Sequence, residues 1–311
     1  MITVLGIVAP VFGIIVLGFV AARLRMLDPA AVIGLVVFVF HFAIPAMLFH
    51  NLARAELPAH IEWSFLVSYY GAALVVYALG MAIGRYSFRR PLAIQATCGM
   101  AAGFSNTVLL GIPLLLTVLG PEAALAIFLL LLPHSAVLMT LTMVLIRLGR
   151  GREVSVGAQL RVVVGELIRN PIILALVAGL SANLSGLVLP GPLATVVQML
   201  GAAAVPCALF AMGASLAAYP LAGDVLSTLP LVLLKLLVHP LLVWVLAVPV
   251  LGLDGVWVPV AVLMATMPTG INVYLVATRY DGGTGVAART IFLSTAISVI
   301  TISTALYLFR S

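Results

Sequence analysis

Three adjacent polar residues interrupt a long apolar stretch of this sequence, residues 92–119. They are Ser105, Asn106 and Thr107. Gly103 and Pro113 flank them; glycine loosens a helix, and proline removes a helical hydrogen bond and clashes with the preceding turn. A helix broken here leaves backbone groups without partners, and amide and hydroxyl side chains can hydrogen-bond both those groups and a ligand. We therefore predict a helix break at this point, with a binding site beside it.

A second interruption of the same kind lies in the apolar stretch 256–278. It contains Pro268, Gly270 and Asn272. In hydrocarbon, an open backbone is tolerated only where it is buried in protein or lines a watery cavity. Two interrupted spans in corresponding places of two halves are the best sequence-level indication of a substrate site in a membrane carrier. Asn106 and Asn272 are the strongest candidates to line it, although both could instead serve only the freed backbone groups.

The distribution of charges favours an anion at this site. The half-helix after each break would direct backbone N–H groups and the positive end of its dipole toward the gap. A proton or sodium antiporter normally keeps a carboxylate at mid-membrane to bind its cation. Here all nine acidic residues fall in loops or at the edges of apolar stretches: Asp28, Glu56, Glu62, Glu122, Glu153, Glu166, Asp224, Asp254 and Asp281. This argues against such an antiporter and for an anionic substrate.

One basic residue lies inside an apolar stretch. Lys235 is about seven residues into the stretch 228–252, roughly 10 Å deep at the rise of a helix. It could extend its ammonium to the membrane interface, or it could supply a fixed positive charge near the anion site. His239 is one turn further along the same face, so the two could act together. His41 and His134 remain open between helix packing and proton coupling.

The composition explains why these polar residues stand out. The chain is 64% hydrophobic and only 8% charged, and repeated apolar stretches of about 20 residues are what a bilayer core requires. The first stretch has no basic residue before it, so we interpret it as a span rather than a cleaved signal. We predict an all-α polytopic membrane protein with ten transmembrane helices, at 2–22, 30–49, 63–84, 92–119, 122–147, 170–189, 193–217, 228–252, 256–278 and 286–309.

The basic residues predict an orientation. Twelve of the 15 lysines and arginines fall in loops on one side of the membrane, and the other side carries only Arg54 and Arg310. Cytoplasmic loops carry the excess of positive charge. We therefore expect both termini on the non-cytoplasmic side of the cytoplasmic (inner) membrane. Orientation also explains the net charge of +6 better than nucleic-acid binding does.

The spacing of several residues indicates an internal repeat. Pro10 and Pro171 are 161 positions apart, and so are Pro45 and Pro206. Asn106 and Asn272 keep a similar offset of 166. Two units of five spans, an odd number, must enter the membrane from opposite sides, which makes them an inverted repeat. We divide the chain into an N-terminal repeat (1–147), a cytosolic linker (148–169) and a C-terminal repeat (170–311).

Several short motifs resemble the auxin efflux carrier family, in its bacterial form with a short central loop. This family belongs with the bile-acid, arsenite and riboflavin transporters. The resemblance extends over nearly the whole chain, and its motifs occur in register. They are FAIP at Phe42–Pro45, SNTVLLGIPL at Ser105–Leu114, RNP at Arg169–Pro171, KLLVHP at Lys235–Pro240, and PTGI at Pro268–Ile271, followed by Ala277 and Tyr280.

The resemblance implies a fold like that of sodium/proton antiporters and bile-acid symporters, with broken helices 4 and 9 that cross. It implies that helices 1, 2, 6 and 7 form a dimerising scaffold, which would include Pro45 and Pro206. Helices 3–5 and 8–10 would form a moving transport domain. The substrates implied are organic anions, commonly malonate or malate for short members of this type.

We therefore expect a secondary transporter of a small carboxylate, malonate-like, malate-like or auxin-like, that works by elevator-type alternating access as a homodimer in the lipid bilayer. The expected site residues are Ser105, Asn106, Thr107, Gly270 and Asn272, with positive field from Lys235 and His239. The alternative is a sodium-coupled, bile-acid-like symporter, whose carbonyl and carboxylate sodium site the sequence does not show.

An enzyme is not expected. The chain has no HExxH motif, no GxSxG turn and no paired acids within its apolar stretches. Its two cysteines, Cys98 and Cys207, form no CxxC or Cys/His ligand pattern. We expect no cofactor and no bound metal.

Overall fold

The computed structural model describes residues 2–58, 60–151, 156–219 and 224–310. Met1, Ser311 and residues 152–155 of the predicted linker lie outside this part. Within it the elements are all helices, apart from one isolated bridge between two residues. The expectation of an all-helical protein is confirmed.

The first five predicted stretches fall on helices, some of them interrupted by short turns of 3-10 or π helix, labelled η. In chain order the helices are α1 (Ile2–Arg23), α2 (Pro29–Phe38), η1 (Val39–Ala43), α3 (Ile44–Leu52), α4 (Ser64–Ala82), η2 (Ile83–Ser87), α5 (Leu92–Gly103), η3 (Thr107–Gly111), α6 (Ile112–Leu119), η4 (Pro121–Ala123) and α7 (Ala124–Gly149).

The second five stretches also fall on helices, after α8 (Val156–Arg169) in the predicted linker. They comprise α9 (Pro171–Ser185), α10 (Gly191–Ala202), α11 (Ala204–Ala217), η5 (Val225–Thr228), α12 (Leu229–Leu233), η6 (Leu234–Val238), α13 (His239–Val245), η7 (Leu246–Val250), α14 (Trp257–Thr266), α15 (Asn272–Arg279) and α16 (Thr284–Arg310).

Six helical segments in the described chain are long and apolar enough to cross a membrane. They are Pro29–Leu52, Ser64–Ser87, Pro121–Gly149, Gly191–Ala217, Val225–Val250 and Thr284–Phe309. Shorter apolar helices occupy the other four predicted stretches, two of which are the broken ones. The protein is therefore an integral membrane protein by length and composition of its helices.

Prolines explain where three of these helices widen into π turns. The turns η1, η3 and η6 each end two residues before a proline: Pro45, Pro113 and Pro240. Proline has no N–H for the helical ladder and its ring clashes with the preceding turn, so the turn before it opens. Pro113 thus lies inside α6, beyond the helix break that it was expected to mark.

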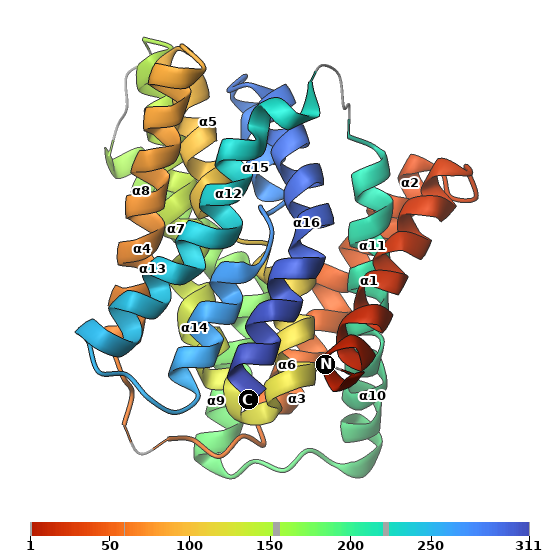
Figure 1. Cartoon of the computed structure of the whole chain (residues 1–311). Coiled ribbons are helices and arrows are strands. Elements are labelled where there is room, and N and C mark those ends of the chain that lie inside the picture. Colours follow the sequence, from red (N-terminus) through yellow and green to blue (C-terminus); the bar gives the residue numbers. More distant parts are fainter. Residues whose placement is uncertain (1, 59, 152–155, 220–223, 311) are drawn as a thin grey trace.

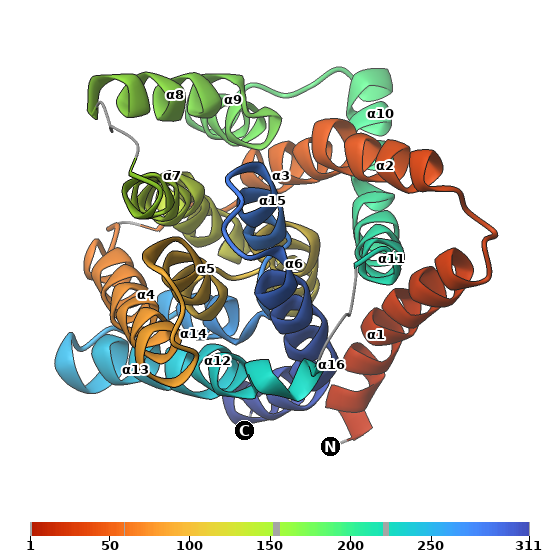
Figure 2. The same ribbon diagram turned by 90° about the horizontal axis from the view of Figure 1, so that it is seen from above.

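The helices pack as two groups, which Figure 2 shows from above. In the first, α1 packs against α11, and α3 packs against α9 and α10. In the second, α5 packs against α4 and α7, and α14 packs against α13 and α16. The second halves of the two broken helices, α6 and α15, lie toward the middle of the bundle (Figures 1 and 2).

The two broken helices cross at their breaks. The α5 helix ends at Gly103, α14 ends at Thr266, and both chains then run extended. Ser105 and Thr269 form an antiparallel bridge there. The amide of Asn106 donates to the carbonyl of Pro268 at 2.8 Å, and the amide of Gly270 donates to the carbonyl of Phe104 at 3.0 Å. Each segment thus supplies hydrogen-bond acceptors for backbone N–H groups of the other, which have no helical partner at the break.

Gly270 is required for this crossing. A Cβ atom there would lie 2.7 Å from the ring of Phe104 and 2.9 Å from the carbonyl oxygen of Ser105. Because any larger residue would push the two chains apart, the glycine predicted from the sequence has a steric role.

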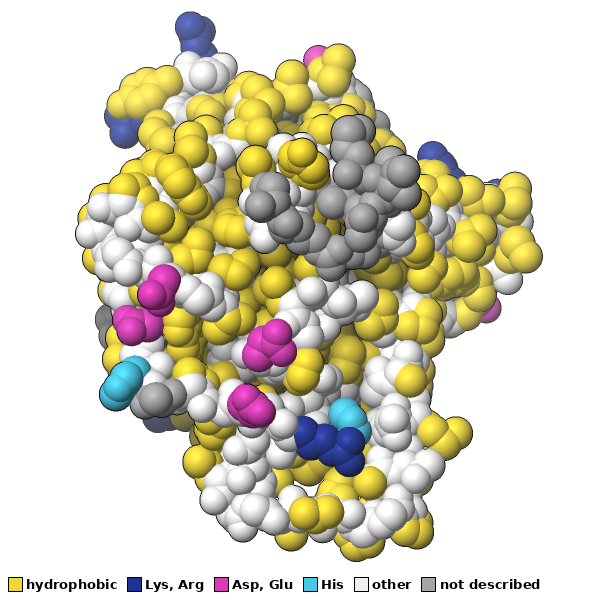
Figure 3. Space-filling model, turned by 60° about the horizontal axis from the view of Figure 1, so that its bottom comes forward, with side chains coloured by type: hydrophobic (Ala, Val, Ile, Leu, Met, Phe, Trp, Pro, Cys, Tyr) yellow, Lys and Arg dark blue, Asp and Glu magenta, His cyan; other side chains and the backbone are white. Residues whose placement is uncertain are grey.

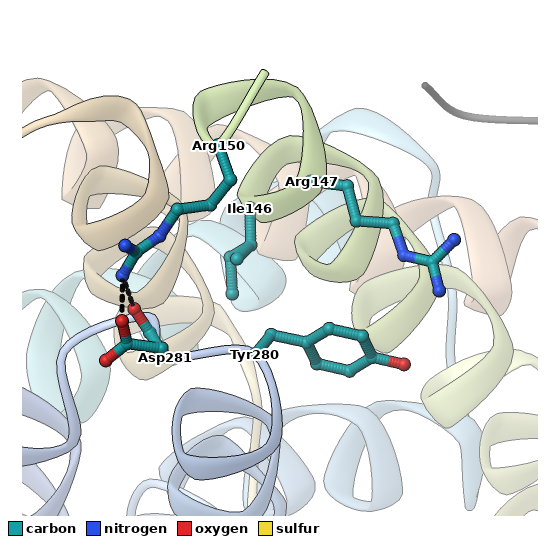
Figure 4. A pocket seen from close by; sticks show the side chains of 5 residues that line it. All are labelled: Ile146, Arg147, Arg150, Tyr280 and Asp281. Atoms are coloured by element: carbon teal, nitrogen blue, oxygen red, sulfur yellow. Dashed lines mark hydrogen bonds and ion pairs between the residues drawn. The ribbon is translucent and has the colours of Figure 1, made fainter. Parts of the chain in front are cut away.

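At one end of the bundle, an ion pair ties α7 to the turn between α15 and α16 (Figure 4). The guanidinium of Arg150 lies 2.6 Å from the carboxylate of Asp281 and also donates to its backbone carbonyl. Arg147 lies over the ring of Tyr280, 5.7 Å from its centre. Both partners of the ion pair are largely exposed, so the contribution to stability is about 1 kcal/mol or less.

Candidate functional site

A buried network of polar side chains forms hydrogen bonds to the two segments that cross. Nζ of Lys235 donates to the hydroxyl of Ser105 at 2.8 Å and to the carbonyl of Ala265 at 2.7 Å. It also lies 3.0 Å from Nδ1 of His239. Lys235 and His239 are fully buried. The ammonium therefore does not extend to the surface of the protein; its three donors meet three acceptors beside the two breaks.

Two further side chains complete this network. The hydroxyl of Tyr69 donates to the hydroxyl of Ser105 at 3.1 Å, and Nε2 of His134 lies 3.3 Å from the carbonyl oxygen of Ser105. The ring of His134 also packs on that of Phe104, with centres 4.4 Å apart. Tyr69 was not predicted, because no local pattern separates it from the neighbouring tyrosine. The role of His134 could not be decided from the sequence.

A cavity of about 70 Å³ lies beside the crossing. Its polar lining comes from four elements: Thr107 in η3, Ser135 in α7, Asn170 before α9, and Asn272 at the start of α15. Apolar side chains from η1, η3, α7, α8 and α9 complete the wall. The cavity therefore joins both halves of the chain and both groups of helices.

Most of these polar side chains have no partner within the described chain. No hydrogen bond is made there by the side chains of Thr107, Ser135 or Asn272, whereas the side-chain oxygen of Asn170 accepts from the amide of Ile172 at 3.0 Å. Polar groups facing a cavity are normally satisfied by water or a ligand. Two hydroxyls and an amide are thus available to a ligand.

The electrostatics of the cavity suit an anion held by neutral donors. None of the residues that line it is acidic, basic or histidine. The α9 and α15 helices begin at Pro171 and Asn272, next to the lining. The N-terminus of a helix carries a partial positive charge. The donor set can bind a carboxylate without a formal positive charge.

The expected site residues fall into separate places. Thr107 and Asn272 line the cavity, whereas Ser105, Lys235 and His239 belong to the buried network. Gly270 forms the crossing itself. His41 is exposed, with Nδ1 3.1 Å from the carbonyl of Val37.

Asn106 does not line this cavity. It is 5% exposed, and its amide lies 3.4 Å from the sulfur of Met212 in α11. The bridge pairs Ser105 with Thr269, an offset of 164 positions, so Asn106 and Asn272 are not opposite each other across the crossing. Ser135 and Asn170 were not predicted as site residues. Asn170 had a signal, since it precedes the proline that opens a predicted span.

Comparison with known proteins identifies the family. Residues 3–307 match the family described as membrane transport protein, which is the auxin efflux carrier family. The chain is also 33% identical, over 307 residues, to a protein of Rhizobium meliloti (strain 1021) named "Putative malonate transporter". That alignment covers 98% of this chain and 96% of the relative. Relatives and family are transporters rather than enzymes, and the chain therefore belongs to the auxin efflux carrier family of membrane transport proteins.

Proposed function

We propose that this protein is a secondary transporter that carries a small carboxylate, of the size and charge of malonate, across the cytoplasmic membrane. The observation that supports this most is the cavity beside the crossing, where the side chains of Thr107, Ser135 and Asn272 have no protein partner in the described chain. Two helix N-termini add positive partial charge. The name of the Rhizobium relative points to the same class of substrate.

The packing supports an elevator-type mechanism. We assign α1, α2–α3, α9 and α10–α11 to a scaffold, which would also form the interface of a homodimer. The helices from α4 to α7 and from α12 to α16 would form the moving group. The cavity takes Phe40 and Asn170 from the first group and Thr107, Ser135 and Asn272 from the second. A rigid shift between the groups would carry the polar side chains past a fixed, mostly apolar wall.

This assignment also explains the role of Lys235. A sodium-coupled symporter would need oxygen ligands for its cation near the crossing. The oxygens of Ser105 and Ala265 in that place already accept hydrogen bonds from Lys235. We therefore propose transport that does not depend on a sodium gradient, and we assign Lys235 to holding the crossing rather than to binding substrate.

The test is uptake of malonate into proteoliposomes. Because each variant removes an unpaired donor of the cavity, Asn272→Ala and Ser135→Ala should each reduce the uptake efficiency about tenfold or more, equivalent to about 1.4 kcal/mol. Thr107→Val should act in the same direction. Replacing sodium by potassium on both sides should leave uptake by the unaltered protein unchanged.

The matched control is Ser181→Ala, an exposed serine of α9 whose hydroxyl donates to the carbonyl of Val177 in its own helix. It should transport normally. Asn106→Ala should cost less than Asn272→Ala, since only the latter lines the cavity. Normal uptake by both Asn272→Ala and Ser135→Ala would contradict the proposed site, and strong sodium stimulation would favour the symporter.

The proposed orientation has its own test. Cysteines introduced next to Met1, at Glu56 and next to Ser311 should react with an impermeant maleimide in intact cells, because the arginine-rich loops hold the opposite face in the cytosol. A cysteine at Met26, which is 72% exposed between α1 and α2, should react only after the membrane is permeabilised. Reaction of the Met26 site alone in intact cells would reverse the assignment.

A further inference from the structure

A second polar cavity lies between the two groups of helices, between α3, α6, α10 and α11. Its volume is about 280 Å³. The polar side chains in its wall are His50 and Asn51 from α3, Thr117 from α6, and Gln198 from α10. No acidic residue lines it.

This cavity and the proposed substrate cavity lie along the same boundary between the two groups of helices. The substrate cavity takes Phe40 from η1 and Thr107 from η3, and the helices that continue from these turns supply His50 and Thr117 to the second cavity. Each pair is ten residues apart along a continuous helical segment, which is about 15 Å. Both walls therefore run in parallel from one cavity to the other. The second cavity lies toward the end of the bundle that we assign to the non-cytoplasmic side.

A positive charge stands at its edge. One guanidinium nitrogen of Arg54 lies 3.3 Å from Nε2 of His50. Since a guanidinium only donates, this ring nitrogen must accept, and the proton of the imidazole is then on Nδ1. Within the described residues Arg54 has no carboxylate within ion-pair distance, and Gln198 makes no side-chain hydrogen bond. In the part of the chain that the structure describes, the remaining N–H groups of Arg54, Nδ1–H of His50 and the amide of Gln198 have no protein acceptor.

Acidic side chains surround the positive charge of Arg54 at this end of the bundle. Figure 3 shows this end, with several acidic side chains spread across it and a basic side chain directly beside a histidine. The loops and helix starts of this end carry Glu56, Glu62, Glu122 and Asp254. These carboxylates repel an approaching anion, whereas Arg54 attracts it toward the second cavity.

We propose that Arg54, His50 and Gln198 form a second anion-binding site, an outer station where a small carboxylate is held before it enters the substrate cavity. The identity of the carboxylate rests on the proposed function. The preference for negative charge does not, because it follows from the donors and from Arg54.

The test measures that preference directly. Gln198→Cys is introduced into a chain in which Cys98 and Cys207 are alanine, and its reaction with anionic sulfonatoethyl methanethiosulfonate is compared with that of a cationic trimethylammonium analogue. In the Arg54→Gln background, the ratio of the anionic to the cationic rate should fall about fivefold or more, because the local positive potential is lost. The control is Arg25→Gln, an exposed arginine in the loop at the opposite end of α2 from α3, which should leave the ratio unchanged.

Malonate provides the second measurement. At constant ionic strength it should slow the modification of Gln198→Cys when Arg54 is present and have no effect in the Arg54→Gln background. An unchanged rate ratio would overturn the anion site. A changed ratio without protection by malonate would remove malonate as its ligand. If malonate uptake is normal while Arg54→Gln changes neither measurement, this inference fails and the proposed function stands.

Discussion

Replacing Lys235 by methionine should lower the free energy of unfolding by about 3 kcal/mol or more and abolish transport. Methionine has nearly the length of lysine but no donor. It would leave the carbonyl of Ala265 and Nδ1 of His239 without the partners that they have in the structure, and it would remove one of two donors to Ser105. Each unsatisfied buried acceptor costs about 1–3 kcal/mol. Thermal unfolding of the purified protein in detergent, together with uptake into proteoliposomes, measures both effects.

Two further variants separate a structural role of Lys235 from a direct effect on substrate. Leu237→Met changes an exposed residue of the same turn and should alter neither stability nor uptake. Lys235→Gln keeps a donor and should be less destabilising than Lys235→Met. If Lys235→Gln instead raised the apparent Kd for malonate about tenfold with unchanged unfolding, the lysine would act on the anion and not on the crossing.

Much of the fold could be predicted because the relevant signals are local. Apolar length places the helices, and glycine or proline places their interruptions, as Gly103 and Pro268 show. The pairing of Ser105 with Thr269 is different, because these residues are 164 positions apart. No pattern in either segment specifies which backbone groups meet. The register of the crossing is a property of how the two groups of helices pack.

The candidate site shows the same limit at the level of side chains. Thr107 and Asn272 were predicted and line the cavity, whereas Asn106, adjacent to Thr107, contacts α11 instead. In an extended segment that leads into a π turn, neighbouring side chains face different surroundings, and helical periodicity does not assign them. Ser135 was missed because a single serine in a long apolar helix usually indicates helix packing.

The side chain of Lys235 shows a further limit of prediction from sequence. Counting residues from the end of the apolar stretch places its Cα at about 10 Å, and this distance is compatible with an ammonium at the interface. The structure has the side chain fully buried on the crossing. The count describes the backbone only; the direction of the side chain depends on acceptors from other segments, the hydroxyl of Ser105 in the break after α5 and the carbonyl of Ala265 in α14.

Replacing Gly213 by alanine should destabilise the protein by about 3 kcal/mol or more, because overpacking at a rigid contact costs about 1–3 kcal/mol and occasionally more. The added Cβ atom would lie 1.9 Å from the carbonyl oxygen of Ile15 in α1, and a Cβ at Gly18 would lie 2.1 Å from the carbonyl oxygen of Phe210 in α11. In both places the added atom would clash with backbone, so the clash cannot be relieved by a change of side-chain rotamer. Thermal unfolding and size-exclusion chromatography in detergent measure the loss.

The matched control for this contact is Gly13→Ala in the same α1 helix, where a Cβ would meet nothing within 4 Å. It should be as stable as the unaltered protein or more so, since alanine favours a helix by about 1 kcal/mol over glycine. Equal stability of Gly213→Ala and Gly13→Ala would show that α1 and α11 are further apart than described. Lipid offers no hydrophobic drive for two apolar helices to associate, so close backbone approach at small residues supplies much of the attraction. Because α1 belongs to the first half of the chain and α11 to the second, the contact at Gly18 and Gly213 joins the halves, and its loss would disrupt the proposed scaffold.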